Sequence, residues 1–195
     1  MGITGSSGSG KSLAREFFCE HGWFGIDADA FAKEVVGSSE IAKKQLGQAF
    51  GADVIKADGS IDNALLAGRS FASKEGAVAL DKITHPLILK EVTKKIAALE
   101  ADRVDRCVLD APLLFESGAD RLCSKTLCVI ADRQTLIRRI LERDGITKER
   151  AVSRLDAQRE PEYYSNRADY TVYNNCDIES FFEQLERILG EHIEI

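Results

Sequence analysis

The chain has 195 residues, of which 30% are charged, and a formal net charge of −6 at pH 7. This length suits one well-packed α/β domain with a small inserted subdomain, and it argues against two independent folds. The acidic balance argues against broad binding to nucleic acid or to anionic membranes, because both attract basic surfaces. We therefore expect no nucleic acid or membrane as partner. We also predict a small-molecule substrate and a monomer or weak homo-oligomer, neither of which follows from composition.

The sequence also predicts a cytoplasmic location. No apolar run approaches the roughly 18 residues of a membrane-spanning helix, and no signal-like segment is visible. Five cysteines, Cys19, Cys107, Cys123, Cys128 and Cys176, form an odd set without a C-x-x-C pair. We interpret them as reduced, mostly buried thiols rather than as a disulfide framework or a zinc site.

A phosphate-binding loop is predicted near the amino terminus. The short apolar stretch 1–4 is followed by Gly5-Ser6-Ser7-Gly8-Ser9-Gly10-Lys11-Ser12, which has the required spacing of glycines, lysine and serine. Backbone N–H groups and the dipole of the following helix bind phosphate oxygens in such a loop, and glycine allows positive φ and close approach. Lys11 would reach the β- and γ-phosphates, and Ser12 would ligate Mg²⁺. The predicted nucleotide-binding residues are Gly5, Gly8, Ser9, Gly10, Lys11, Ser12 and Leu13.

A flexible Gly/Ser linker, of the kind that expression vectors leave behind, is the alternative interpretation of residues 5–10. Any sequence could follow a linker, whereas these glycines lead directly into residues 11–18, whose pattern predicts an amphipathic helix. We therefore favour the phosphate loop, which indicates a nucleotide and leaves the second substrate open.

Buried strands are predicted at residues 1–4, 23–26, 107–109, 126–130 and 170–172, with helical patterns between them. Strands that alternate with helices predict a parallel sheet covered on both faces, with ligands at the carboxyl ends of the strands. The expected fold class is therefore α/β, a three-layer α/β/α arrangement on a five-stranded parallel sheet. The first strand is short, and whether residues precede Met1 stays open.

Two helical segments are predicted to be added to this core. Residues 31–103 far exceed the single crossover helix that a parallel strand pair needs. Within them we expect a turn at Asp58-Gly59 and a helix start at His85-Pro86. We interpret 31–103 as an acceptor-binding insertion and 133–167 as a lid. The nucleotide-binding core of this single domain, 1–195, would then comprise 1–30, 104–132 and 168–195, with an amphipathic closing helix after Asp177.

Acidic residues end two of the predicted strands. The second strand runs into Asp27 and Asp29, and period-two alternation would place both carboxylates on one face if the strand extends that far. One of them could orient and deprotonate an attacking hydroxyl, and helix capping is the alternative for either. We favour catalysis for Asp29, and capping or a metal-water contact for Asp27. The third strand ends in Asp110, a Walker-B-like position that typically holds Mg²⁺ directly or through water.

Residues 133–159 form a basic segment in an acidic protein, with seven arginines and one lysine against four acids. Arg139 and Arg143 are four residues apart on one helical face. A mobile arginine that arrives on closure stabilises the charge of a transferring phosphoryl group. The alternative is a solvated helix face paired with Glu142 and Asp144. Because the phosphate loop is present, we favour a lid.

In this order, the motifs resemble those of the dephospho-coenzyme A kinase family, a group of small phosphate-loop kinases. The match runs almost end to end. Its most specific segments are Pro-Leu-Leu-Phe-Glu at 112–116 and Arg-Leu-Asp-Ala-Gln at 154–158, because other phosphate-loop enzymes do not carry them together. The remaining matches are at residues 2–5, 8–12, 26–29, 32, 35–36, 85–88, 108–111, 139, 143–144, 168–169 and 174–175.

The resemblance implies transfer of the ATP γ-phosphoryl group to the ribose 3′-hydroxyl of dephospho-coenzyme A, with ATP and Mg²⁺ bound. By position, it implies that Asp29 orients and deprotonates that hydroxyl and that Ser12 and Asp110 hold the metal. Lys11, Arg139 and Arg143 would be the other catalytic residues. The resemblance also implies that the 174–175 loop lies near the adenine, with Asn175 as a binding residue.

The chain departs from the family's pattern at three places. Ser6-Ser7 replace a glycine and an apolar residue, and Leu13 replaces a common threonine, without loss of a required donor. Residues 62–65 lack the basic side chains common there, which weakens the prediction of acceptor contacts.

Two alternative functions remain: a kinase of the same fold for a nucleoside or sugar, and a nucleotide switch that transfers no phosphate. Residues 147–150 lack the aspartate of a guanine-reading element, and a pure binder would not need the acid pair. We therefore favour the kinase.

Overall fold

A computed structural model describes residues 1–175 and 177–193, with the side chains of residues 1–175 and 177–191. The chain forms two compact units. The first comprises Met1–Asp27 and Arg103–Ile195, and the second comprises Ala28–Asp102. Asp29 therefore belongs to the second unit, whereas the phosphate loop belongs to the first.

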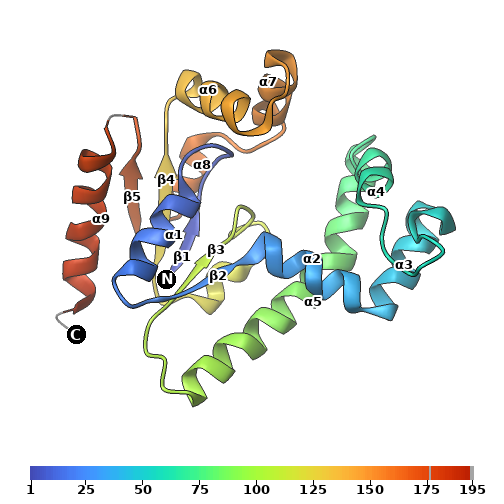
Figure 1. The fold of residues 1–195 in the computed structure, drawn as a ribbon, viewed down its shortest axis with the longest axis horizontal. Coiled ribbons are helices and arrows are strands. Elements are labelled where there is room, and N and C mark those ends of the chain that lie inside the picture. Colours follow the sequence, from blue (N-terminus) through green and yellow to red (C-terminus); the bar gives the residue numbers. More distant parts are fainter. Residues whose placement is uncertain (176, 194–195) are drawn as a thin grey trace. The chain divides into compact units, whose positions relative to one another are not determined.

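The described residues of the first unit contain one sheet of five parallel strands in the order β2-β3-β1-β4-β5 (Figure 1). The strands are β1 (Gly2–Thr4), β2 (Phe24–Asp27), β3 (Cys107–Asp110), β4 (Thr126–Ile130) and β5 (Tyr170–Tyr173). Each lies within one residue of a predicted strand, so the predicted parallel sheet is confirmed. Strand β1 is central, between β3 and β4, and the chain reverses its direction of winding there. Open parallel sheets bind ligands at such a switch point.

Helices pack on the sheet and bury its three inner strands, β1, β3 and β4, more completely than the edge strands β2 and β5. Helices α1 (Lys11–Glu20) and α9 (Ile178–Ile193) pack on one face, where Phe18 and Phe181 are fully buried. Phe181, Leu185, Ile188 and Leu189 recur at helical spacing and form one apolar stripe, so the predicted closing helix is confirmed. The short helices η2 (Ala119–Leu122) and α8 (Pro161–Ser165) also contact the sheet, at β1 and β4 respectively.

Helices α6 (Arg133–Asp144) and α7 (Lys148–Asp156) form a separate helical pair after β4. Leu136, Ile140, Ala151 and Leu155 are buried together between them. The carboxylate of Asp132 accepts a hydrogen bond from the Thr135 backbone N–H at 2.9 Å and caps α6. This basic segment therefore folds around a small apolar core, and its arginines stand on the outside of that core.

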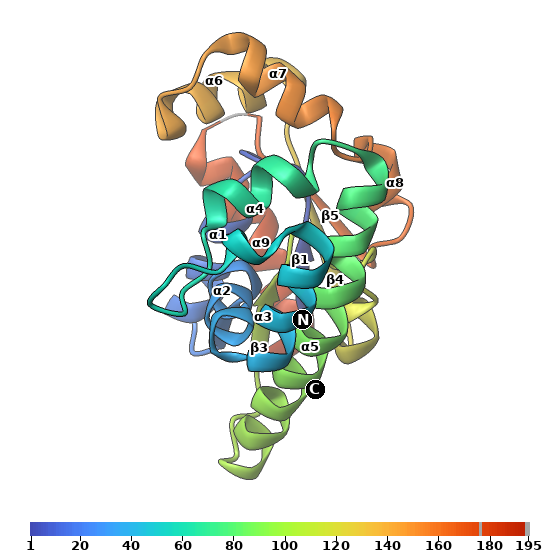
Figure 2. The same cartoon turned by 90° about the vertical axis from the view of Figure 1, so that its right-hand side faces the viewer.

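The second unit is helical and has its own core. Helices α2 (Ala28–Ser38), α3 (Glu40–Phe50) and α4 (Asn63–Ser70) each contact the long helix α5 (Lys74–Ala101) (Figure 2). The short helix η1 (Ala52–Val54) follows α3, and Leu46 and Val54 are fully buried in the core. The predicted turn at residues 58–59 is confirmed, because the Gly59 N–H donates to the Lys56 carbonyl at 2.9 Å.

The predicted helix start at His85-Pro86 is wrong. Pro86 lies inside α5, which begins at Lys74 after the capping residue Ser73. The Ser73 hydroxyl oxygen accepts a hydrogen bond from the Gly76 N–H at 3.0 Å. Proline favours the first turn of a helix because it lacks an N–H. Here the contacts of α5 with three other helices of the unit outweigh that local preference.

Four of the cysteines lie in the described part of the chain, and all four are free thiols. Cys128 is buried, and burial raises the pKa of its thiol to about 12. Cys107 and Cys123 are partly buried, whereas Cys19 is exposed. Cys176 lies outside the described residues. None of the helices in the described residues is long and apolar enough to cross a membrane.

Candidate active site

The loop between β1 and α1 is held so close to its neighbours that two of its glycines, Gly5 and Gly10, have no room for a side chain. Gly5 and Gly10 have φ values of 140° and 106°. A Cβ atom at Gly5 would overlap the carbonyl oxygen of Val129, and one at Gly10 would overlap the amide nitrogen of Asn174. The backbone therefore turns tightly at the carboxyl end of the central strand and delivers the first turn of α1 to that edge.

The lysine of the loop folds back over it. The Lys11 ammonium donates to the Ser6 carbonyl at 3.0 Å, and the Ser9 N–H donates to the same carbonyl at 3.2 Å. The Ser9 hydroxyl is buried without a hydrogen-bond partner in the described residues. A bent run of backbone amides at a helix N-terminus, with a cation beside it, is suited to a phosphate group.

Two carboxylates and an arginine lie at the same edge of the sheet. Asp27 and Asp110 are paired in register at the ends of β2 and β3. The Ser12 hydroxyl donates to Asp110 Oδ2 at 3.1 Å. Arg15 bridges the two acids, because its Nη1 lies 3.7 Å from Asp27 Oδ2 and its Nε lies 4.0 Å from Asp110 Oδ2. Burial raises the pKa of Asp110, and the nearby Lys11 ammonium opposes that rise.

Asp110 and Ser12 fit a magnesium ion. Asp110 is 5% exposed, and its Oδ1 is buried without a hydrogen-bond partner among the described residues. Its Oδ2 and the Ser12 hydroxyl are already together. Carboxylate and hydroxyl oxygens are hard ligands, and Mg²⁺ commonly uses one or two of them with water and substrate phosphates. Three-residue clusters of His, Cys, Asp or Glu are absent from the described residues, and this mode of binding does not require one.

Asp27 and Asp29 do not share a strand face, which corrects our prediction of period-two alternation. Strand β2 ends at Asp27, and Asp29 lies in the first turn of α2. The helix begins immediately after the strand, so the two carboxylates follow helical rather than extended geometry. Asp29 is exposed, and an acid in the first turn interacts favourably with the helix dipole.

The two predicted lid arginines contact the phosphate loop directly. Arg139 donates to the Gly8 carbonyl at 3.4 Å and to Asn174 Oδ1 at 3.1 Å. Arg143 donates to the Ser7 hydroxyl at 3.4 Å. The two residues are therefore brought together at the loop, as their spacing on α6 predicts.

Gln158, near the end of the basic segment, also contacts Ser7. The Ser7 N–H donates to Gln158 Oε1 at 3.0 Å. Asp144 pairs with both Arg143 and Arg154, and its hydrogen bond with Arg143 lowers the pKa of Asp144 to about 2. Arg143 therefore has a carboxylate partner that stays ionised at neutral pH. The hydroxyl of Ser7, which departs from the family pattern, supplies an acceptor for Arg143 that an apolar side chain could not.

Asn174 is a site residue that our sequence analysis did not select. Its side chain is buried and donates to the Ser9 carbonyl at 2.8 Å, whereas Asn175 is exposed and accepts from the Asp132 N–H at 2.7 Å. The Asn174 N–H continues the β5–β4 pairing with the Ile130 carbonyl. Alternation beyond β5 therefore points residues 172 and 174 inward, and this signal could have distinguished the two asparagines.

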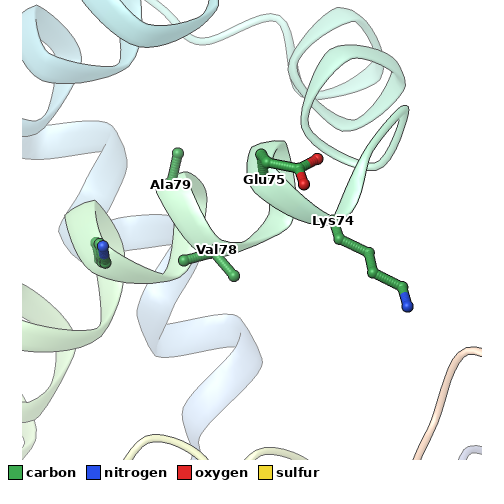
Figure 3. A pocket seen from close by; sticks show the side chains of 5 residues that line it. Lys74, Glu75, Val78 and Ala79 are labelled. Atoms are coloured by element: carbon green, nitrogen blue, oxygen red, sulfur yellow. The ribbon is translucent and has the colours of Figure 1, made fainter.

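One pocket in the first unit and one in the second combine apolar and charged lining residues. One, of about 370 Å³, belongs to the first unit and is lined by Gly10, Leu13, Arg139, Asn174 and Ile178. The other, of about 380 Å³, lies at the start of α5 in the second unit (Figure 3). Its lining residues are Lys74, Glu75, Val78, Ala79 and Lys82.

The stretch 62–65, where the family commonly has basic residues, has a structural role here. Asp62 Oδ1 accepts from the Leu65 N–H at 3.0 Å and caps α4.

Taken together, the central-strand loop, its lysine and the serine–aspartate pair define a P-loop nucleotide-binding protein. Two solved structures share the whole fold. A protein from Thermus thermophilus described as TT1252 has a TM-score of 0.81 at 29% identity, with 97% of this chain and 95% of that chain covered. Dephospho-CoA kinase from Campylobacter jejuni has a TM-score of 0.71 at 26% identity, with 97% and 94% covered.

The sequence comparisons identify the family. The dephospho-CoA kinase family model matches residues 1–180. A dephospho-CoA kinase from Corynebacterium glutamicum is 34% identical over 191 residues, which covers 98% of each chain. The chain belongs to the dephospho-CoA kinase family. Membership makes it an ATP-dependent kinase of coenzyme A synthesis and confirms the function predicted from the sequence.

We expect the substitution Gly10→Ala to weaken ATP binding at least about tenfold. The new Cβ atom would displace Asn174 from the loop, in addition to the roughly 1–2 kcal/mol that a left-handed conformation costs a non-glycine residue. Gly22→Ala is the matched control, because Gly22 follows the same helix with φ of 86° and has open space around its Cα. Both variants place alanine at a positive φ, but only Gly10→Ala adds the overlap with Asn174. Isothermal titration measures the affinity of each variant for ATP, and equal affinities would contradict the prediction.

Proposed function

We propose that this chain transfers the γ-phosphoryl group of ATP to the ribose 3′-hydroxyl of dephospho-coenzyme A through the residues gathered at the P-loop. The observation that carries the proposal is the junction of β1 and α1, where Lys11, Arg139 and Arg143 contact one bent loop. Three cations at a helix N-terminus would neutralise the polyphosphate and the charge that develops during transfer. Arg139 and Arg143 would act from a lid formed by residues 133–167.

In the proposed reaction the acceptor hydroxyl oxygen attacks the γ-phosphorus, the bond from that phosphorus to the β–γ bridging oxygen breaks, and ADP leaves. Asp29 would accept the hydroxyl proton as the new bond forms. Its exposure supports this assignment, as does its place two residues after Asp27, which ends β2 beside Asp110. Asp27 would instead stay with Arg15.

Ser12 and Asp110 would hold Mg²⁺. When bound, the ion neutralises charge on the β- and γ-phosphates. The fit of these two residues supports the assignment, because Ser12 already donates to Asp110 Oδ2 and Oδ1 has no hydrogen-bond partner among the described residues. Ser12 follows the loop after β1, and Asp110 ends β3. These two strands are paired in the sheet.

The second unit would hold the acceptor. Its pocket at the start of α5 combines two lysines, Lys74 and Lys82, and one acid, Glu75, with the apolar Val78 and Ala79 (Figure 3). Dephospho-coenzyme A has the matching chemistry, since it carries a pyrophosphate and a long, partly apolar arm. The helical core of this unit would support such a site, because its helices pack on α5. The base of ATP would occupy the pocket beside Leu13, Asn174 and Ile178.

Incubation with Mg-ATP and a panel of hydroxyl acceptors tests the acceptor. We expect ADP release that depends on dephospho-coenzyme A, with coenzyme A as the product, and only background release with nucleosides, shikimate or gluconate. Coenzyme A formation is followed by mass spectrometry. Equal turnover of a nucleoside or sugar would assign the chain to another acceptor, and ADP release with no acceptor dependence would reject the transfer.

We expect Lys11→Ala to reduce turnover to background, because the β- and γ-phosphates lose their positioned cation. Arg187→Ala is the control for loss of a positive charge, since Arg187 is exposed on α9. Steady-state assays of ADP release compare the two variants. Near-normal turnover by Lys11→Ala would reject the role of the lysine.

We expect Asp29→Asn to lower kcat by about 10²-fold or more, the usual scale of general-base catalysis, while ATP affinity is largely kept. Glu34→Gln is the matched control because Glu34 is an exposed acid further along α2. Single-turnover kinetics with saturating ATP measures the chemical step. A rate equal to that of the unmodified enzyme would demote Asp29 to a residue that stabilises the helix.

A further inference from the structure

Asn174 is a buried polar side chain on which two parts of the proposed site converge. It follows β5, and it is 5% exposed. We propose that Asn174 is a positioning residue that fixes the P-loop backbone and the guanidinium of Arg139 in one arrangement. This inference rests on the proposed catalytic role of Arg139.

Both polar atoms of the Asn174 side chain are used. Its Nδ2 donates to the Ser9 carbonyl at 2.8 Å, and its Oδ1 accepts from Arg139 Nη2 at 3.1 Å. Arg139 Nη1 donates to the Gly8 carbonyl at 3.4 Å. The amide and the guanidinium therefore hold two successive carbonyls of the loop, and they also hold each other. A side chain that only filled space would not need a donor and an acceptor in these places.

The first contact orients the loop. Ser9 and Gly10 share a trans peptide, in which the C=O and the N–H point in opposite directions. Because Asn174 holds the Ser9 carbonyl on its own side, the Gly10 N–H points to the opposite side. Gly10 is also where a Cβ would overlap Asn174. The Asn174 side-chain amide thus limits rotation of the Ser9–Gly10 peptide and keeps the Gly10 N–H pointing in one direction.

The second contact holds a cation without neutralising it. Burial lowers the pKa of Arg139 from its usual value, and Asn174 and Gly8 provide neutral acceptors. Among the described residues no carboxylate forms an ion pair with Arg139. Arg143 is different, since Asp144 pairs with it. Arg139 therefore keeps a full positive charge that an anionic substrate can use, in a position set by an amide rather than by an acid.

A double-mutant cycle on Asn174 and Arg139 tests the inference. We expect Asn174→Ala and Arg139→Ala each to lower kcat about tenfold or more. In the double variant, the loss should be clearly smaller than the product of the two single losses, because Asn174 acts in part through Arg139. Asn174→Asp should lower kcat at least as far as Asn174→Ala, since a carboxylate cannot donate to the Ser9 carbonyl and would neutralise Arg139.

Matched controls separate this role from general effects on stability or charge. Gln184, on α9, makes comparable contacts with the end of β5, because it accepts from the Tyr173 N–H and donates to the Tyr173 carbonyl, both at 2.9 Å. Gln184→Ala should leave kcat unchanged. Arg138 is exposed on α6, and Arg138→Ala should also leave kcat unchanged. Thermal unfolding is measured for every variant. If Asn174→Ala does not fold, the cycle is run with Asn174→Asp.

The outcomes distinguish this inference from the proposed function. If Arg139→Ala leaves kcat unchanged, the role of the arginine fails, and the inference fails with it. If Arg139→Ala lowers kcat but the two losses multiply in the double variant, only the inference is overturned. A rise in KM for ATP without a change in kcat for Asn174→Ala would also overturn it, because a contact with the base would then explain the residue.

Discussion

Close contact between the backbone of residues 5–10 and its neighbours is the constraint on which the rest of this structure depends. A Cβ atom at Gly5 would overlap the main chain of β4, and one at Gly10 would overlap the side chain of Asn174. The chain can turn from the central strand into α1 within six residues only because these positions have no side chain. That turn brings the helix N-terminus, Lys11 and Ser12 to the edge of the sheet where β3 delivers Asp110.

The charges around this turn are held in different ways. Arg15 lies beside two acids, and Arg143 is paired with Asp144. Arg139 is held by an amide and a carbonyl, which position a cation without cancelling its charge. Electrostatic stabilisation of a transition state depends on charges oriented before the reaction begins. In the proposed reaction, neutral hydrogen bonds would provide that orientation for Arg139, and a salt bridge would provide it for Arg143.

In the proposed reaction, the two units would have different tasks. The first contains the sheet, the loop and the nucleotide-side pocket. The second has a helical core of its own and a pocket with two lysines. Asp29 is the second residue of the second unit, two residues after the last residue of β2. Helix α2 follows β2 without an intervening loop. The proposed base, Asp29, is therefore only two residues along the chain from Asp27 at the end of β2.

Much of this arrangement follows from local patterns in the sequence. The apolar runs determined the five strands, the glycine spacing determined the loop, and the helical spacing of residues 181–189 determined the closing helix, because each signal lies within a few neighbouring residues. Tertiary structure alone decided that Asp29 belongs to a helix, that Pro86 lies inside α5, and that Asn174 rather than Asn175 reaches the loop. Asn174 and Ser9 are 165 residues apart in the chain, so their hydrogen bond exists only because β5 and the central strand belong to one sheet.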